Sequence, residues 1–150
     1  MANLLKRFSK KVVGSDGRIY DYLAKITASG DFKRIQDLNV IISSWNNILL
    51  TPKRTYLHDP EYGSDLHLLV FEPADDATIT RIKSEIQDPL RTYDNRATIE
   101  NIDVLLRPNG KGYQLNISVE YEGVKGALTV SFDDSTVLAQ QSGSAGGSTI

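Results

Sequence analysis

Apolar side chains recur every third or fourth residue in two stretches of the chain, a spacing typical of helices with one buried face. The first stretch runs over about residues 38–50, after Asp37, a residue type that favours a helix N-terminus, and it ends before Pro52. The second extends over about residues 76–93 and contains Pro89. The apolar positions are Leu38, Ile41, Ile42, Trp45, Ile48 and Leu49, then Ile79, Ile82, Ile86 and Leu90. We therefore expect two helices that each turn one face toward a core.

Beyond Arg96 the apolar period changes from about 3.6 residues to about 2, which predicts β-strands. Three strands are expected, around residues 102–106, 113–121 and 124–132, joined by turns that contain glycine. Strands linked in this way form an antiparallel meander with one apolar face. The pattern predicts an α+β fold in which two core helices pack on one face of a small antiparallel meander sheet.

The 150 residues are enough for one domain, and composition divides them into three segments. Residues 1–30 have little periodicity and are expected to form an N-terminal arm, either ordered by a partner, folded over the sheet as a loop, or frayed. Residues 31–134 form the predicted domain. Residues 135–150 are rich in serine and glycine, so we expect a flexible tail.

A small meander leaves unpaired backbone groups at its two edges. If the three strands keep their sequence order, the strand at 123–132 lies at one edge and carries little charge. A partner could add a strand there, next to Val124, Leu128 and Val130. The alternative is that a loop from the first 30 residues covers this edge.

Charge is distributed unevenly along the chain, although the net charge is −2. Residues 1–54 contain ten Lys/Arg and four Asp/Glu, whereas residues 55–150 contain seven and fifteen. A basic segment on an acidic body favours association with copies or partners, and scattered solvated charge is the alternative. No second basic cluster is interleaved with aromatics, so we expect no nucleic-acid binding. No apolar run is long enough for a bilayer or a secretory signal, which predicts a cytosolic origin and no membrane contact.

Few residue types suited to catalysis or metal binding are present. The chain contains no cysteine and two histidines, His58 and His67, whose spacing matches no common metal motif. The carboxylates near enough in sequence to form a hydrolytic pair are Asp59, Glu61, Asp65 and Glu72. They lie in turn-forming contexts that explain them without catalysis, so we predict no catalytic, metal or cofactor site.

A polar segment of sixteen residues, 51–66, follows the first predicted helix. Its prolines and Gly63 predict an ordered loop, and long ordered loops in compact domains are usually functional. Because Arg and Tyr are preferred at protein–protein contacts, we expect a docking surface. The candidate contact residues are Arg54, Tyr56, Asp59, Glu61 and Tyr62. The alternative is an Ω-like loop that packs on its own helix.

This loop also resembles a known family through Leu49-Leu50-Thr51-Pro52-Lys53-Arg54-Thr55 and Asp59-Pro60-Glu61-Tyr62-Gly63-Ser64-Asp65-Leu66. Phe71-Glu72-Pro73, a predicted helix and Tyr93-Asp94-Asn95-Arg96 follow in the same order. Over about residues 37–132 the chain is similar to the small baseplate wedge subunits of contractile phage tails, which also occur in type VI secretion. The family usually has a glycine and an acidic residue where this chain has Lys53 and then Arg54 or Thr55, and Glu-Pro-Arg where it has Asp94-Asn95-Arg96.

The resemblance implies a structural, non-enzymatic protein of the inner baseplate around the tail tube of a phage particle. The implied partners are other baseplate wedge proteins, tail tube or hub proteins, and the tail sheath, which begins to assemble on the subunit by strand exchange. Multiple copies are expected in a symmetric ring. The implied wedge contact involves Asp94 and Arg96, and the alternative role for Arg96 is to cap the carbonyls at the end of the preceding helix. We expect Arg96→Ala to leave the isolated domain folded and to weaken wedge binding.

Two other functions compete with this interpretation. Some members of the family carry a lysozyme label, so a peptidoglycan-degrading hydrolase is one alternative. A generic oligomeric adaptor is the other.

Overall fold

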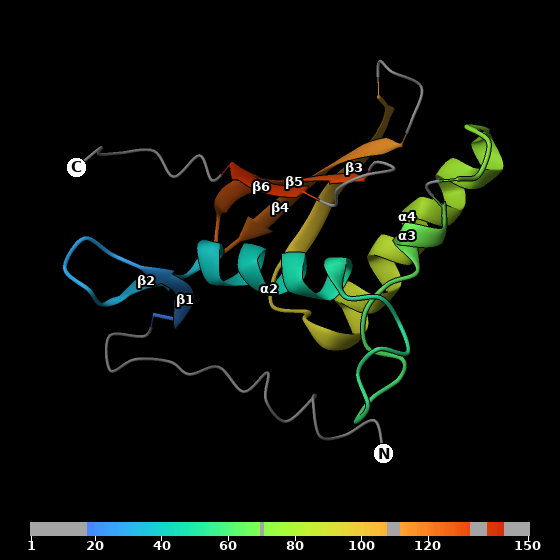
Figure 1. Cartoon of the computed structure of the whole chain (residues 1–150). Helices are drawn as coiled ribbons and strands as arrows, with labels where there is room; N and C mark the ends of the chain where they lie inside the picture. Colours follow the sequence, from blue (N-terminus) through green and yellow to red (C-terminus); the bar gives the residue numbers. More distant parts are fainter. Residues whose placement is uncertain (1–17, 70, 108–111, 133–137, 143–150) are drawn as a thin grey trace.

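Two strands, three helices and four further strands follow one another along the described chain (Figure 1). The fold is that of a computed structural model, which describes residues 18–69, 71–107, 112–132 and 138–142. The elements are β1 (Tyr20–Ile26), β2 (Phe32–Gln36), α2 (Leu38–Leu50), α3 (Leu66–Leu69), α4 (Asp76–Tyr93), β3 (Thr98–Leu106), β4 (Tyr113–Tyr121), β5 (Val124–Phe132) and β6 (Leu138–Ser142).

Helix α2 has the bounds that its apolar periodicity predicts, and it buries Ile41, Ile42 and Trp45. Asp37 is its N-cap residue, as the sequence predicts, although the Asp37 side chain makes no capping hydrogen bond. Its carboxylate accepts a hydrogen bond from the main-chain N–H of Ile19 at 3.2 Å. Its own N–H donates to the Ile19 carbonyl at 2.8 Å. Asp37 therefore joins the start of the first hairpin to α2.

Asp75 is the N-cap residue of helix α4. The Asp75 carboxylate accepts a hydrogen bond from the N–H of Thr78 at 2.7 Å, and this bond lowers the pKa of Asp75. The helix continues through Pro89, although proline has no N–H to donate to the carbonyl of Glu85. Its buried apolar residues are Ile82, Ile86 and Leu90.

The three predicted strands are confirmed as β3, β4 and β5, which pair antiparallel in sequence order. In their register Ile102 lies opposite Ile117, and Ile117 lies opposite Leu128. All three side chains are buried. Because strand residues alternate between the two faces, this row places the apolar residues of the three strands on one face.

A fourth strand, β6, pairs with β5 from Ala127↔Ser142 to Ser131↔Leu138. The prediction that β5 is an edge strand is therefore wrong, and so is the prediction of a flexible tail at residues 138–142. The sequence of this segment has no clear apolar alternation, and pairing through backbone groups does not require one. Residues 135–137 and 143–150 lie outside the described residues. Within the described part of the chain, the edge strands of this sheet are β3 and β6.

Strands β1 and β2 form a separate antiparallel hairpin, with Tyr20 opposite Gln36 and Ile26 opposite Phe32. Gly30 has a φ of 83° in the connecting turn. The predicted domain boundary at residue 30 thus falls inside this hairpin. Residues 1–17 of the predicted arm lie outside the described residues.

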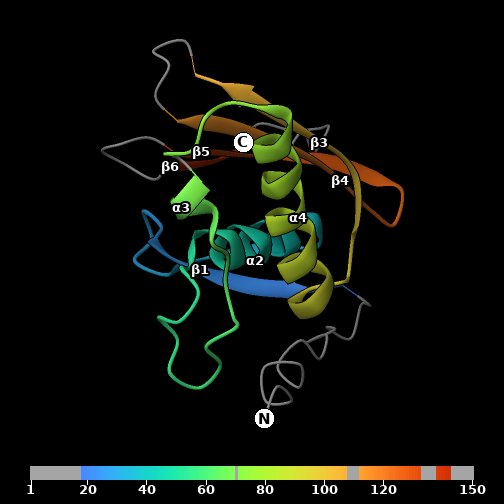
Figure 2. The same ribbon diagram turned by 90° about the vertical axis from the view of Figure 1, so that its right-hand side faces the viewer.

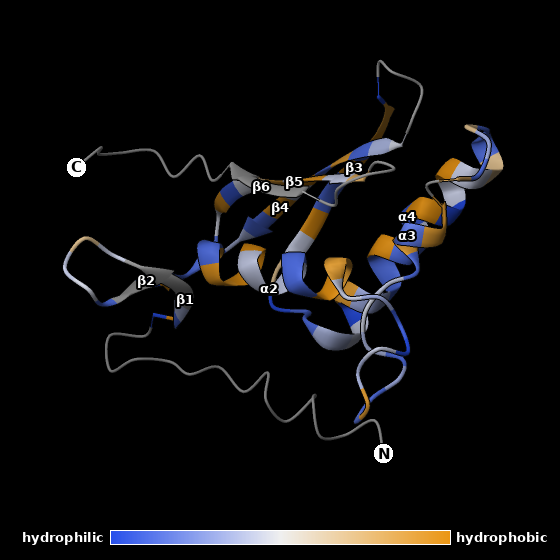
Figure 3. Ribbon diagram, viewed as in Figure 1, coloured by the Kyte–Doolittle hydropathy of each residue, from blue (hydrophilic) through white to orange (hydrophobic). Residues whose placement is uncertain are grey.

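Helix α2 lies beneath the four-stranded sheet in two perpendicular views (Figures 1 and 2). A Cβ atom at Gly126 of β5 would lie 2.7 Å from Leu38 Cδ2 and 3.3 Å from Ile42 Cδ1, so the two elements approach closely there. Hydrophobic and hydrophilic residues are interspersed on α2 and α4, as expected of amphipathic helices (Figure 3). The α+β class with antiparallel sheets is confirmed, and the packing of both helices on one sheet face stays a prediction.

Candidate functional site

The loop between α2 and α3 closes on itself through backbone hydrogen bonds. Lys53 N–H donates to the Ser64 carbonyl at 3.2 Å, and Ser64 N–H donates to the Thr51 carbonyl at 2.9 Å. Gly63 has a φ of 111°, and a Cβ atom there would lie 2.2 Å from the Thr51 carbonyl oxygen. Glycine is therefore required at this position. The loop is ordered, as its turn chemistry predicts.

Side chains tie this loop to its two neighbouring helices. Ser64 Oγ donates to the carbonyl of Leu49 in α2 at 2.6 Å. Lys53 Nζ lies 3.2 Å from Glu85 Oε2 of α4, and the same oxygen accepts the main-chain N–H of Asp65 at 3.2 Å. Lys53, which stands where the related family usually has glycine, thus fastens the loop to α4.

Aromatic rings and one buried carboxylate fill the space beneath the loop. The ring centroids of Tyr62 and Tyr93 are 5.1 Å apart, and those of Tyr56 and Tyr62 are 5.7 Å apart. Asp59 is buried and accepts hydrogen bonds from the Tyr93 hydroxyl at 3.2 Å and from Glu61 N–H at 3.1 Å. Burial, followed by the charge and hydrogen bond of Asp59, raises the pKa of Tyr93 to about 12. Asp59 and Tyr62 therefore support the loop from within.

The outer side of the loop carries side chains that remain accessible. Leu57 is 92 % exposed, and Tyr56, Arg54 and Glu61 are also exposed. Sequence reasoning missed Leu57, although a single leucine in the middle of a polar loop was the available signal. The fixed backbone presents this leucine without support from neighbouring apolar residues.

Asp94 and Arg96 bind each other. Arg96 Nε lies 2.7 Å from Asp94 Oδ1, and a terminal guanidinium nitrogen lies 2.5 Å from Oδ2. The Asp94 side chain is 2 % exposed, whereas that of Arg96 is 19 % exposed. These hydrogen bonds raise the pKa of Arg96. The Arg96 guanidinium thus binds the carboxylate of Asp94, the residue that ends α4. Little of the guanidinium remains accessible to a partner.

The candidate residues fall into two places in the structure. The Asp94–Arg96 pair lies close to the loop, because Tyr93, the residue before Asp94, donates its hydroxyl to Asp59 of the loop at 3.2 Å. Leu128 and Val130 are fully buried in β5, which is covered by β6, and a partner strand cannot pair beside them as predicted. Val124 is partly exposed at the start of β5, beyond the residues that pair with β6.

Three of the four carboxylates that the sequence offered for hydrolysis, Asp59, Asp65 and Glu72, have partners in the structure. Asp65 lies 3.9 Å from Lys53 Nζ, and Glu72 accepts hydrogen bonds from Arg81. Asp59 binds Tyr93, as described above. In the described part of the chain, no three His, Asp or Glu side chains are grouped so that they could hold a metal ion. The helices in that part include none with the length and apolar character needed to cross a bilayer.

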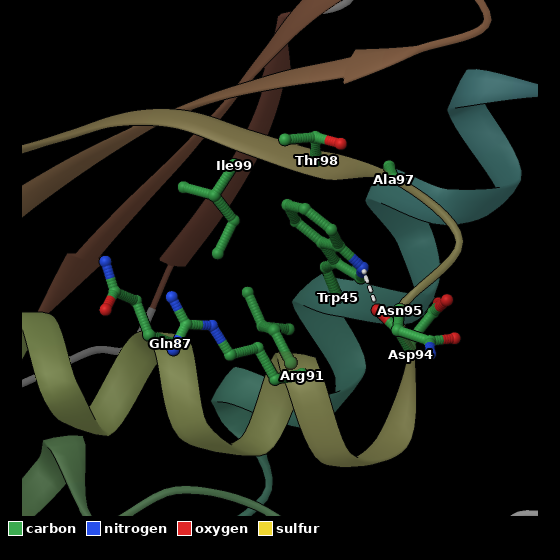
Figure 4. A pocket seen from close by; sticks show the side chains of 9 residues that line it. Trp45, Gln87, Arg91, Asp94, Asn95, Ala97, Thr98 and Ile99 are labelled. Atoms are coloured by element: carbon green, nitrogen blue, oxygen red, sulfur yellow. Dashed lines mark hydrogen bonds between the residues drawn. The ribbon is translucent and has the colours of Figure 1, made fainter.

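A hollow of about 230 Å³ opens beside Asp94, between α2, the end of α4 and the start of β3 (Figure 4). At the back of the hollow, the indole N–H of Trp45 donates to the Asp94 carbonyl at 3.2 Å. Gln87 and Arg91 extend from α4 toward β3, and Ile99 extends from β3 toward α4. The volume is below the roughly 300–1,000 Å³ of most small-molecule sites, which favours a side chain as its occupant.

Comparison with known proteins identifies one family. Residues 36–125 match the family described as baseplate wedge protein gp25. Comparison with curated proteins gives no match. Similar solved structures include a subunit of the baseplate of the anti-feeding prophage, with 14 % identity, a TM-score of 0.61, and coverage of 71 % of this chain and 86 % of that chain.

Two further structures are similar. A chain of the postcontracted pyocin R2 baseplate has 22 % identity and a TM-score of 0.58, and the match covers 70 % of this chain and 100 % of that one. A protein from Geobacter sulfurreducens, provisionally described as a tail lysozyme, has 19 % identity, a TM-score of 0.57, and coverage of 63 % and 88 %. At these identities the likeness shows a shared fold. The family match spans more than half of the chain, which therefore belongs to the baseplate wedge protein gp25 family, a structural component of contractile tail baseplates.

Proposed function

We propose that this protein binds other wedge proteins of the baseplate around the tail tube and provides the platform on which the contractile sheath begins to assemble. It acts by offering surfaces to neighbouring subunits, and it breaks no covalent bond. Multiple copies stand in a symmetric ring, with tail tube or hub proteins inside it. The observation that carries the proposal is the loop of residues 51–65, which is fixed from within and exposes Leu57 at its outer side.

The loop is suited to a wedge contact because it is already ordered. A loop that is ordered before binding loses less conformational entropy when a partner arrives. Arg54, Tyr56 and Leu57 offer a cation, an aromatic ring and an aliphatic side chain on its accessible side. Asp94 and Arg96 directly follow Tyr93, which contacts the loop through Asp59, and Arg96 retains some exposure. We infer that these residues form one continuous wedge contact.

Strand addition by the sheath is proposed at β3. Among the described strands β3 pairs with β4 alone, so its outer backbone groups are open to another chain. Leu105 and Leu106, near its end, are 49 % and 53 % exposed. Because β6 covers β5, β3 replaces β5 as the proposed position for an added strand.

The carboxylates that could act in hydrolysis do not favour the hydrolase alternative. A glycosidase needs two carboxyl groups free to act on the glycosidic bond, one of them as an acid. Asp59, Asp65 and Glu72 are engaged by Tyr93, Lys53 and Arg81, respectively. The provisional lysozyme description belongs to a protein with 19 % identity, a level at which the likeness concerns the fold and not the activity.

Co-expression with the wedge and sheath proteins of the same tail tests the proposal. An affinity-tagged full chain is expected to retain both classes of protein through purification. If it retains neither, it cannot act as a sheath platform, and the proposal is wrong. A turbidity assay on peptidoglycan tests the alternative, because lysis that disappears in Glu61→Gln would establish hydrolysis.

A further inference from the structure

Two side chains with hydrogen-bond donors, Gln87 and Arg91, line the hollow beside Asp94. Within the described residues, neither the Arg91 guanidinium nor the Gln87 side-chain amide takes part in a hydrogen bond or ion pair, and both extend into this space (Figure 4). Asp94 also lines it, but its carboxylate is already bound by Arg96 through two hydrogen bonds. Arg91 is exposed, so its guanidinium lies at the mouth of the hollow and is accessible to a partner's carboxylate.

Three apolar side chains form part of the remaining wall, beside the polar Asn95 and Thr98. Trp45 and Leu90 are almost fully buried, and Trp45 is held by its hydrogen bond to the Asp94 carbonyl at 3.2 Å. Ile99 is partly buried and faces them from β3. An apolar side chain would fit against these walls while a neighbouring acceptor reached Arg91.

The position of the hollow determines the form of its occupant. Ala97, Thr98 and Ile99 line it, and the last two are the first residues of β3, whose outer edge is open. A strand added to this edge sends alternate side chains toward the face where Ile99 lies. The hollow thus lies directly beside the path of an added strand.

We propose that this hollow recognises an acidic strand of the sheath protein, with an apolar side chain of that strand against Trp45 and Ile99 and a carboxylate bound to Arg91. The inference rests on the proposed sheath contact and specifies its chemistry. Charge complementarity carries it, because Arg91 has no ionic partner among the described residues and a planar guanidinium can bind a carboxylate through two hydrogen bonds. The acceptor groups of an added strand would also satisfy Gln87.

Site-specific cross-linking tests the proposal, because the chain has no cysteine of its own. Thr98→Cys, labelled with benzophenone-maleimide, places a photoreactive group at the hollow without changing Arg91 or Gln87. In assembled tails it is expected to cross-link a sheath segment that has Asp or Glu within two residues. Thr92→Cys is the matched control, since Thr92 is exposed on α4 outside the hollow. A cross-link to a wedge protein or to a sheath segment without an acidic residue overturns the proposal, as does the absence of a cross-link.

A charge reversal provides the second measurement. Arg91→Glu is expected to reduce the sheath protein retained by the full chain at least tenfold, whereas Lys83→Glu, an equal change elsewhere on α4, leaves it unchanged. If the wild-type chain retains no sheath, the proposed function fails. If Arg91→Glu retains as much sheath as the wild type, the sheath contact stands and the role of Arg91 is refuted.

Discussion

Trp45 of α2 donates its indole N–H to the main-chain carbonyl of Asp94, the residue that ends α4, over 3.2 Å. Trp45 is 1 % exposed, so this bond connects the core to the segment that carries Asp94 and Arg96. The position of the proposed wedge contact is thereby set by the packing of two helices. Substitutions here should affect folding before they affect binding.

Arg96→Ala is expected to destabilise the isolated protein, by about 3 kcal/mol, because the buried Asp94 carboxylate loses its ionic partner. The expectation drawn from the sequence is that the domain stays folded and binds wedge proteins less well; the structure adds this loss of stability. Urea unfolding of the wild type and the variant measures the loss. The double variant Asp94→Asn with Arg96→Ala is the control and should recover much of the stability. A single variant as stable as the wild type would show that the pair contributes little.

Gly63→Ala should destabilise the protein by more than about 3 kcal/mol. Its added Cβ would lie 2.2 Å from the Thr51 carbonyl oxygen, and the position has a φ of 111°. Gly123→Ala is the matched control, with a φ of 78° and no atom within 4 Å of the added Cβ. It should cost only about 1–2 kcal/mol from backbone strain. If thermal unfolding shows that Gly63→Ala and Gly123→Ala lose the same stability, the loop is not closed at Thr51.

Leu57→Ser is expected to leave the melting temperature unchanged, since this side chain is 92 % exposed. Wedge protein retained by the tagged chain should fall at least tenfold, because an apolar anchor is lost from the proposed contact. Leu68→Ser removes another exposed leucine, from α3, and should retain wedge protein normally. Identical retention by both variants would exclude Leu57 from the interface.

Stability should decrease as the pH rises from about 10 toward 12. The pKa of Tyr93 is raised to about 12 in the folded protein, while an unfolded tyrosine titrates near 10. Over this range the folded state keeps a proton that the unfolded state releases, so its stabilisation is complete below pH 10 and is lost through pH 12. Urea unfolding at several pH values should give a shallower decline for Tyr93→Phe than for the wild type. If the stability of the two proteins falls equally with pH, Tyr93 does not contribute to the pH dependence.

Periodicity predicted the elements whose side chains face the core. α2, α4 and the row of Ile102, Ile117 and Leu128 follow from apolar spacing, because burial itself imposes that spacing. β6 was missed because backbone pairing alone defines it, and its sequence carries no matching pattern. This omission also placed the open edge on the wrong strand.

The candidate site was predictable only in part. Turn residues indicated an ordered loop at 51–66, but no sequence pattern shows that Asp59 is buried and supports the loop from within. The Asp94–Arg96 pair and the Lys53–Glu85 contact depend on tertiary positions that spacing does not specify. That Arg91 has no ionic partner among the described residues likewise emerges only when α4 and β3 are placed together.

A cryo-EM reconstruction of the assembled tail tests the central claim most directly. We predict density from other subunits against Leu57 and along the outer edge of β3, with an acidic side chain at Arg91. Solvent at both surfaces, together with a glycan fragment bound among Asp59, Glu61 and Asp65, would contradict the claim that this protein acts only through its contacts.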